Sequence, residues 1–266
     1  MTVRQAIKRW LYGSCPGIAG AFPYFGVRVH FPRRSIIFEA ACGQGIYEQH
    51  NLQAMLAFAR AGSVVLDVGA NIGLMTVPVL ASRPEVRVVS FEASPGTLAY
   101  LSKTRAGCAY ANRWEIVPKA AGREAGTAAF SVSAPASGAY DGLRSTQRAE
   151  PEKVITVEVT TVDAEWRRLK CPEVSVIKID VEGGEYDVLL GAADCIARCQ
   201  PAVVLEWGQR NFEAYGRSMG DLLAIARKLG YRVWALPYFA EVADPAALRL
   251  YASVTESFLL FADAAE

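Results

Sequence analysis

The segment from Val64 to Gly73, with the sequence VVLDVGANIG, constrains the fold of this chain more than any other stretch. Its apolar run predicts a buried parallel strand, and Gly69 and Gly73 predict a tight loop that leads into a helix. Open α/β sheets hold nucleotide-like ligands at such loops, beside the carboxyl ends of the strands. Small residues also allow a helix to pack closely on a strand without a ligand, so the loop needs support from other motifs.

A second apolar strand, from Arg87 to Phe91, provides that support because it ends in an acid, Glu92. Glu92 follows Asp67 by 25 residues, which is the length of one strand–helix–strand unit. A carboxylate at the tip of the second strand can accept hydrogen bonds from both hydroxyls of a ribose. We therefore expect Glu92, with its neighbours Ala93 and Ser94, to contribute to a ribose site.

The composition of the first loop favours one kind of ligand. Dinucleotide-binding loops read Gly-x-Gly-x-x-Gly, and Asn71 replaces the middle glycine here, where its side chain would crowd a pyrophosphate. Asp67 would repel a pyrophosphate but suits a ligand with an amine. S-adenosylmethionine carries an amine, a sulfonium and a ribose, and no phosphate. We expect it to be bound by the loop residues Asp67, Gly69, Ala70, Asn71 and Gly73.

A third strand, from Val174 to Ile179, leads into the acids Asp180, Glu182 and Glu185. With this segment the chain resembles the FkbM-type family of S-adenosylmethionine-dependent methyltransferases. The marks of that family are an Asp-Val-Gly-Ala-Asn-x-Gly loop, a Phe-Glu-Pro-x-Pro second strand and a Lys-Ile-Asp-Val-Glu-Gly-x-Glu segment. The resemblance runs from about residue 45 to residue 206. Two small departures, Ala93 for proline and Gly184 for alanine, remove no polar group.

The resemblance implies an α/β, Rossmann-like class I methyltransferase fold, with a seven-stranded, mostly parallel sheet, a final antiparallel strand and helices on both faces. The apolar pattern predicts the alternation itself. It places strands near 63–68, 86–91, 114–118, 174–180, 201–206, 231–236 and 256–261, and helices near 72–82, 96–106, 185–197 and 218–229. We divide the chain into an N-terminal accessory or cap segment, 1–60, and a methyltransferase domain, 61–266.

Two regions lie outside this alternation. In the cap, residues 4–11 are basic with apolar residues at helical spacing, which predicts a short helix that packs on the domain or a partner, with contact to a membrane surface as the alternative. Residues 26–40 predict a hairpin with its turn at 32–35, and a helix follows at 46–61. Between 119 and 162, strand-like segments at 127–132 and 154–159 flank a loop, 133–152, that is either a substrate lid or disordered.

Composition excludes several classes of protein. The 28 basic and 27 acidic residues leave a net charge of +1, so no strong field favours nucleic acid. No apolar run approaches the roughly 20 residues of a membrane-spanning helix, and the start does not resemble a secretory signal. The six cysteines lack a Cys-x-x-Cys motif, and Cys195 and Cys199 are expected to be buried packing residues. These features predict a cytoplasmic protein with reduced thiols.

Methyl transfer from a sulfonium requires an acceptor held close to the methyl carbon and, for a hydroxyl acceptor, removal of a proton. We expect the residues that act on the acceptor to lie at the strand tips or just before the first core helix. They are Glu48, Lys178, Asp180, Glu182 and Glu206, of which Asp180 also contributes to the cofactor site.

Two further interpretations of these charges remain open. Asp180 and Glu206 can clamp a divalent cation, although we expect no metal. Alternatively, Lys178 only neutralises a buried acid and Glu185 only caps its helix.

The acceptor is the least constrained part of the prediction. Tyr47, Trp207 and Tyr238 are candidates for an aromatic platform. The resemblance implies a hydroxyl on a sugar, a glycolipid or a polyketide-type molecule. A non-catalytic scaffold that binds S-adenosylmethionine is one alternative, and an NAD-dependent oxidoreductase is another.

Overall fold

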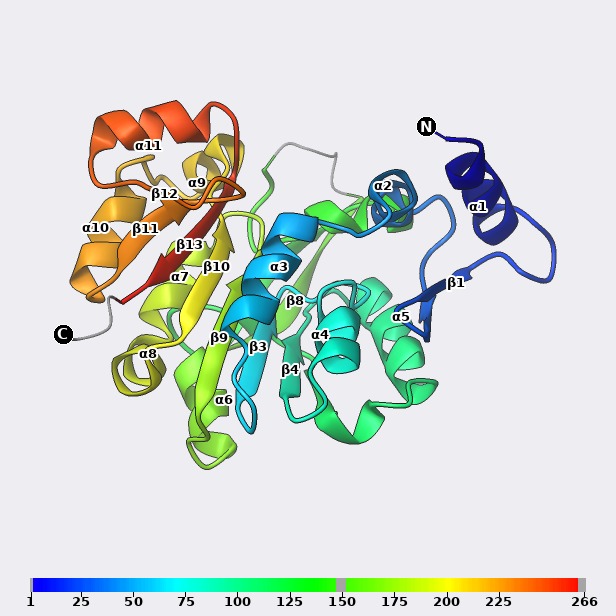
Figure 1. Cartoon of the computed structure of the whole chain (residues 1–266), viewed down its shortest axis with the longest axis horizontal. Coiled ribbons are helices and arrows are strands. Elements are labelled where there is room, and N and C mark those ends of the chain that lie inside the picture. Colours follow the sequence, from blue (N-terminus) through cyan, green and yellow to red (C-terminus); the bar gives the residue numbers. More distant parts are fainter. Residues whose placement is uncertain (1, 147–151, 263–266) are drawn as a thin grey trace.

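A computed structural model describes residues 2–146 and 152–262, and its centre is one mixed, mostly parallel sheet (Figure 1). The strand order across the sheet is β12-β11-β13-β10-β9-β3-β4-β5. Its members are β3 (Val64–Val68), β4 (Arg87–Phe91), β5 (Trp114–Val117), β9 (Val174–Ile179), β10 (Ala202–Glu206), β11 (Arg232–Ala235), β12 (Ala240–Glu241) and β13 (Ser257–Phe261).

The predicted α/β fold is confirmed, with one correction to the strand count. All seven predicted strands form, and β13 runs antiparallel to both β10 and β11, as expected. The sheet has eight strands in the described part of the chain, because β12 pairs with β11 at the edge. A strand of two residues shows no alternation of apolar and polar positions, so its pairing was invisible in the sequence.

Helices cover both faces of the sheet, and alternate residues of each strand contact them. Val64, Leu66 and Val68 belong to one core cluster with α6 (Val162–Arg168), α7 (Glu185–Leu190), α8 (Ala193–Cys199), α10 (Asp221–Lys228) and α11 (Pro245–Ala252). Val65 belongs to the other cluster, with α3 (Gln49–Phe58), α4 (Thr76–Ser82) and α5 (Pro95–Ala106). A short α9 (Gln209–Ala214) follows β10.

The predicted helix 185–197 is two helices. The break falls at Gly191, where the backbone lies so close to Gly122 that a β-carbon would come within 2.1 Å of the Gly122 carbonyl oxygen. The predicted helix 72–82 begins only at Thr76, after Gly73 takes a positive φ of 92°. Both differences thus occur at or next to a glycine, and at Gly73 the positive φ is a conformation that glycine adopts readily.

The N-terminal hairpin lies earlier in the chain than we predicted. It joins β1 (Ala21–Tyr24) to β2 (Val27–His30) through Phe25 and Gly26, which both have positive φ. Residues 36–40, predicted as its second strand, belong instead to the helix α2 (Ile36–Gln44). The Ser35 hydroxyl caps this helix by accepting from the Phe38 N–H at 3.2 Å. Its buried residues are also spaced like one face of a helix.

The N-terminal segment shares its core with the sheet. Hairpin, α2 and α3 residues join the same cluster as Val65, whereas α1 (Val3–Gly13) has no buried residue and lies at one end of the molecule (Figure 1). The division of the chain at residue 60 remains a prediction.

The interval between β5 and β9 forms a second, three-stranded sheet. β6 (Ala120–Ala121) and β7 (Gly126–Val132) both pair with β8 (Lys153–Thr160). The strands β7 and β8 confirm the two strand-like segments that we predicted at 127–132 and 154–159. The loop between β7 and β8 contains a 3-10 helix, η2 (Pro135–Tyr140). A second 3-10 helix, η1 (Ala111–Arg113), precedes β5. Part of the predicted loop, residues 147–151, lies outside the described residues.

Two expectations from composition can be compared with the structure. The described helices include none with the length and apolar character needed to cross a bilayer. All six cysteines are free, and Cys195 and Cys199 are buried in the core, as predicted.

Candidate active site

The candidate site lies where four neighbouring strands, β10, β9, β3 and β4, end at the same edge of the sheet. All three pairings among them are parallel. The chain continues from β3 toward β4 and β5 on one side, while β9 and β10 lie on the other. Such a switch point leaves a crevice beyond the strand ends, where ligands of α/β proteins bind.

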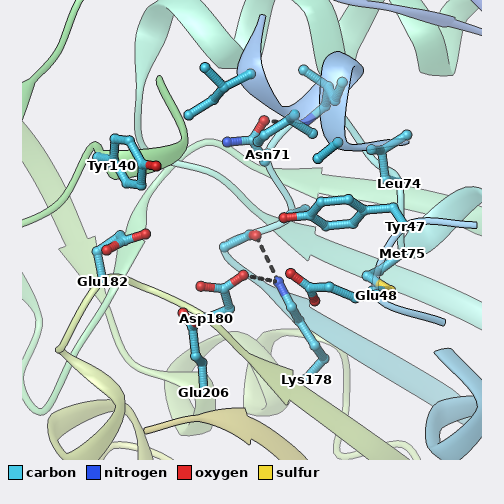
Figure 2. A pocket seen from close by; sticks show the side chains of 16 residues that line it. Tyr47, Glu48, Asn71, Leu74, Met75, Tyr140, Lys178, Asp180, Glu182 and Glu206 are labelled. Atoms are coloured by element: carbon cyan, nitrogen blue, oxygen red, sulfur yellow. Dashed lines mark hydrogen bonds and ion pairs between the residues drawn. The ribbon is translucent and has the colours of Figure 1, made fainter. Parts of the chain in front are cut away.

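Two adjoining cavities occupy this crevice. The larger has a volume of about 280 Å³, and the smaller one of about 70 Å³. Gly69, Asp180 and Glu182 line both. The larger cavity, shown in Figure 2, is bounded by α2, the glycine loop and the tips of β9 and β10. The smaller is bounded by the tip of β4 and by residues of the three-stranded sheet.

The glycine loop is held against the tip of β9. Gly69 has a φ of 80°, and a β-carbon there would lie 1.8 Å from the Asp180 carbonyl oxygen. The N–H groups of Gly69 and Ala70 both donate to the Phe91 carbonyl oxygen. The close backbone approach, and not only the turn that we predicted, therefore requires glycine at position 69.

A buried lysine connects the strands beneath the loop. Lys178 Nζ lies 3.1 Å from the Gly69 carbonyl oxygen, 3.2 Å from Asp180 Oδ2 and 3.7 Å from Asp67 Oδ1. Burial lowers the pKa of Lys178, but the charges of Asp180, Asp67 and Glu48 outweigh it and raise that pKa above its ordinary value. Lys178 is therefore a fixed cation.

Glu92 lies at the wall of the smaller cavity and is buried. Its Oε2 accepts from the Asn71 N–H at 2.9 Å, and its Oε1 accepts from the Ser94 N–H at 2.7 Å. Burial raises the pKa of Glu92 to about 7, although both hydrogen bonds oppose the rise. Each carboxylate oxygen retains the capacity to accept a further hydrogen bond from a ligand.

The long loop after β7 contacts the residues that follow the tips of β3 and β4. Asp141 accepts from the Ser94 hydroxyl and from the Ser133 N–H, each at 2.7 Å. The Asn71 amide donates to the Gly138 carbonyl oxygen at 3.3 Å. These contacts place the described part of the predicted lid, residues 133–146, against the site.

Glu48 reaches the larger cavity from the N-terminus of α3. The Asn51 amide donates to Glu48 Oε2 at 3.0 Å. Burial raises the pKa of Glu48, and the nearby Asp180 carboxylate adds to the rise, while Lys178 opposes it. Burial also raises the pKa of the neighbouring Tyr47 hydroxyl well above its ordinary value. Glu48 is thus a carboxylate whose affinity for a proton is increased.

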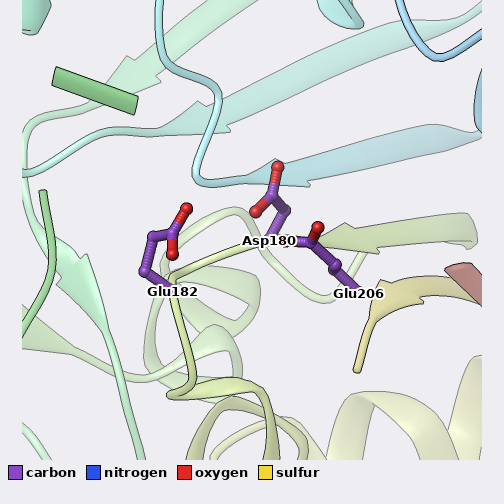
Figure 3. A group of neighbouring side chains, drawn as sticks. All are labelled: Asp180, Glu182 and Glu206. Carbon is purple, nitrogen blue, oxygen red and sulfur yellow. The ribbon is translucent and has the colours of Figure 1, made fainter. Parts of the chain in front are cut away.

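Three further carboxylates converge at the tips of β9 and β10 (Figure 3). One oxygen each of Asp180, Glu182 and Glu206 lies within 4.8 Å of the others. Glu182 is 6% exposed and sits in a turn that Glu185 supports, since Glu185 Oε1 accepts from the N–H groups of Val181 and Gly183. Oxygen ligands of this kind can hold a divalent cation, and exposed acids also cluster without one.

The predicted residues separate into two groups. Those that line a cavity are Glu48, Gly69, Ala70, Asn71, Glu92, Ala93, Lys178, Asp180, Glu182 and Glu206. Those that lie behind the cavity walls are Asp67, which accepts from the Thr76 hydroxyl at 2.6 Å, Gly73, which packs on Leu101 and Trp114, and Ser94.

The predicted aromatic platform is wrong for two of its three members. Tyr47 lines the larger cavity. Trp207 is buried in the core against Phe212, and Tyr238 is exposed on the surface, so neither contributes to the site.

Several cavity residues escaped the sequence analysis. Ile36, Ile37 and Ala40 line the larger cavity from α2, which we had predicted as a strand. Tyr140 also lines it, from the loop that we had singled out only as a whole. The one available signal was Ser35, a capping residue directly before an apolar run.

Comparisons with known proteins agree with this geometry. A family model described as a methyltransferase FkbM domain matches residues 67–233. No curated protein is significantly similar to the chain.

Similar solved structures include three methyltransferases. The FkbM methyltransferase of Methylobacillus flagellatus is 18% identical over 77% of this chain and 45% of its own, with a TM-score of 0.47. A precorrin-6y C5,15-methyltransferase of Geobacter metallireducens is 11% identical, over 79% and 84% of the two chains, with a TM-score of 0.40. A TehB-like S-adenosylmethionine-dependent methyltransferase of Corynebacterium glutamicum is 13% identical, over 85% and 93%, with a TM-score of 0.41. This chain thus spans less than half of the first of these proteins.

The contact between Gly69 and Asp180 can be tested against a matched glycine. Gly62 has a similar φ of 75° but no atom within 4 Å of its β-carbon position. Gly62→Ala should cost about 1–2 kcal/mol of unfolding free energy, from the backbone conformation alone. Gly69→Ala should cost roughly 2–5 kcal/mol, because it adds a backbone clash. Urea unfolding measures both, and equal losses would show that the approach of the two segments is not constraining.

Proposed function

Because the chain belongs to the FkbM methyltransferase family, whose cofactor is S-adenosylmethionine, we propose that it methylates a hydroxyl oxygen of a sugar, a glycolipid or a polyketide-type molecule. One observation carries this proposal. A smaller cavity with Glu92 and apolar residues at its wall joins a larger cavity lined by Glu48 and Glu206, with Asp180 and Glu182 lining both, at the tips of adjacent parallel strands. The first suits a nucleoside, and the second suits an acceptor that must lose a proton.

The residues of the smaller cavity fit the nucleoside part of the cofactor. Phe91, Ala93 and Phe130 give it an apolar wall that suits an adenine ring. Glu92, whose oxygens can each accept one more hydrogen bond, suits the two ribose hydroxyls. At the glycine loop, the nearby cation Lys178 is already shared between two carboxylates, which disfavours a pyrophosphate.

We assign separate roles in methyl transfer to the residues of the larger cavity. When bound, S-adenosylmethionine supplies an electrophilic methyl carbon. The acceptor hydroxyl must then give its proton to a base as its oxygen bonds to that carbon. We assign this base to Glu48, because burial and Asp180 raise its pKa while it faces the cavity. Lys178 cannot accept a proton while it is held as a cation, so we assign it a positioning role.

The other acids of the larger cavity suit recognition of the acceptor. Asp180, Glu182 and Glu206 offer carboxylate oxygens that can accept from hydroxyl groups, which a sugar-like acceptor carries in number. Asp180 is also adjacent to the cofactor loop, since Lys178 bonds both to it and to Gly69. These contacts support the placement of the acceptor between Glu48 and the tip of β10.

The proposed cofactor site predicts a pH-dependent affinity. Only ionised Glu92 can accept from both ribose hydroxyls, and burial raises its pKa to about 7. Affinity for S-adenosylhomocysteine should therefore rise by up to about tenfold per pH unit below that pKa and level off above it. Glu92→Ala should weaken binding by about 1.5–3 kcal/mol and flatten the profile.

Calorimetric titration at several pH values measures both effects, with NAD as the control ligand. Tight binding of NAD without a response to S-adenosylhomocysteine would refute the proposed cofactor. An unchanged affinity in Glu92→Ala would refute only the role of Glu92.

The proposed base predicts a separation of turnover from binding. Glu48→Gln should lower turnover by ~10²- to 10⁴-fold and leave S-adenosylhomocysteine affinity nearly unchanged. The exposed Glu124, which lies outside both cavities, provides a matched control, and Glu124→Gln should have no effect. Transfer of labelled methyl to a panel of hydroxylated acceptors measures turnover. Equal turnover in the two variants would remove Glu48 from the mechanism.

The three clustered carboxylates allow a test for metal. We propose that Asp180, Glu182 and Glu206 contact the acceptor and hold no required cation, so EDTA should leave turnover unchanged. Loss of turnover with EDTA and its recovery with magnesium would contradict this and make the three acids ligands. Asp180→Asn would then reproduce the effect of the chelator.

A further inference from the structure

Helix α1 presents its apolar side chains to the outside of the protein. Val3, Ile7 and Trp10 are 78%, 57% and 62% exposed. They are spaced at i, i+4 and i+7, so they form one stripe along the helix. No residue of α1 is buried.

The polar side of the same helix makes its attachments to the protein. The Gln5 amide donates to the Gly43 carbonyl oxygen, and Arg9 forms an ion pair with Glu39 at 2.8 Å. Lys8 Nζ lies 5.0 Å from the centre of the Phe22 ring. A helix that belongs to a globular domain normally turns its apolar face to the core. In α1, Tyr12 packs against the core, whereas Val3, Ile7 and Trp10 stay exposed, so this apolar stripe is available to something else.

The charge of this part of the chain indicates what that is. Residues 2–39 contain six basic residues and one acidic residue, Glu39, which pairs with Arg9, whereas the whole chain has a net charge of only +1. Arg4 and Lys8 lie on α1 beside the apolar stripe. A short helix with an apolar face, basic flanks and a tryptophan is suited to the interface of an anionic bilayer, where each basic residue adds attraction.

We propose that α1 docks this protein onto an anionic lipid surface. A second copy of the chain is a poorer occupant, because a symmetric contact places the same patch on both sides and would bring the basic segments together. An anionic lipid surface suits both features of α1, since its interior solvates the apolar stripe and its head groups neutralise the basic residues.

The docking face lies close to the proposed acceptor site. α2 separates the two, since Ile37 and Ala40 line the larger cavity while Cys42 borders the groove beneath α1. Docking would thus bring the cavity near the membrane surface, where a lipid-linked acceptor resides. This consequence rests on the proposed function, whereas the docking itself does not.

Vesicle binding tests the proposal without any assay of activity. Trp10 is exposed, whereas Trp114, Trp166 and Trp207 are buried and Trp234 stacks on Phe261, so a change in tryptophan emission on docking should come mainly from Trp10. Vesicles of phosphatidylcholine with phosphatidylglycerol should shift the emission to shorter wavelength and carry the protein into the pellet. Vesicles of phosphatidylcholine alone should do much less. Binding should weaken as salt shortens the Debye length from about 8 Å at 0.15 M to about 3 Å at 1 M.

Exposed residues supply variants that should remain folded. Ile7→Ser with Trp10→Ser should lower co-sedimentation by at least about tenfold. Arg4→Gln should lower it about fivefold. Leu250→Ser with Val254→Ser changes two side chains of similar exposure, 64% and 62%, at a distant surface and should have no effect.

Three results would overturn the proposal. The first is no binding to anionic vesicles, and the second is an equal loss in the Leu250 and Val254 control variant. The third is a dimer in sedimentation equilibrium that Ile7→Ser with Trp10→Ser abolishes, together with no vesicle binding, since the stripe would then contact a second copy of the chain.

Discussion

The buried charge of Lys178 is the interaction on which the rest of the site depends. Lys178 and Asp67 are register partners in neighbouring strands, and Asp180 lies two residues further along β9, on the same face. The lysine thus bonds its own strand, its neighbour and the glycine loop at once. Desolvation of a single charge costs several kcal/mol, and loss of one partner from such a group typically costs about 3–5 kcal/mol. The three charges consequently form one unit that positions the loop.

The glycine loop and the loop after β7, which we call the insertion, complete the site around Lys178 and its two carboxylate partners. The loop reaches the tip of β9 only because position 69 lacks a β-carbon. Asn71 then links the loop to Glu92 and to the backbone of Gly138. Asp141 links the insertion to Ser94 in the same way. A chain of hydrogen bonds therefore runs from the strand tips to the loop after β7.

The N-terminal region adds what the sheet does not provide. Glu48 and the apolar wall of the larger cavity come from α3 and α2, before the first strand of the sheet. These elements share a core cluster with the sheet, so this wall of the larger cavity is packed on the core. α1 differs because it has no fully buried residue, attaches through polar contacts and Tyr12, and keeps Val3, Ile7 and Trp10 exposed. The same segment thus shapes the acceptor cavity at one end and, by our proposal, meets a lipid surface at the other.

The sequence by itself determined the sheet, the order of strands and helices along the chain and most of the charged residues that line the cavities. Buried parallel strands are continuous apolar runs, and the polar residues directly after them must lie at one edge. The tertiary structure decided the rest. Whether residues 36–40 formed a strand or a helix depended on the Ser35 cap and on packing in the core. That Asp67 pairs with Lys178 depended on the register of β3 and β9. Local patterns report which residues are buried, but only the assembled chain sets which buried charges meet.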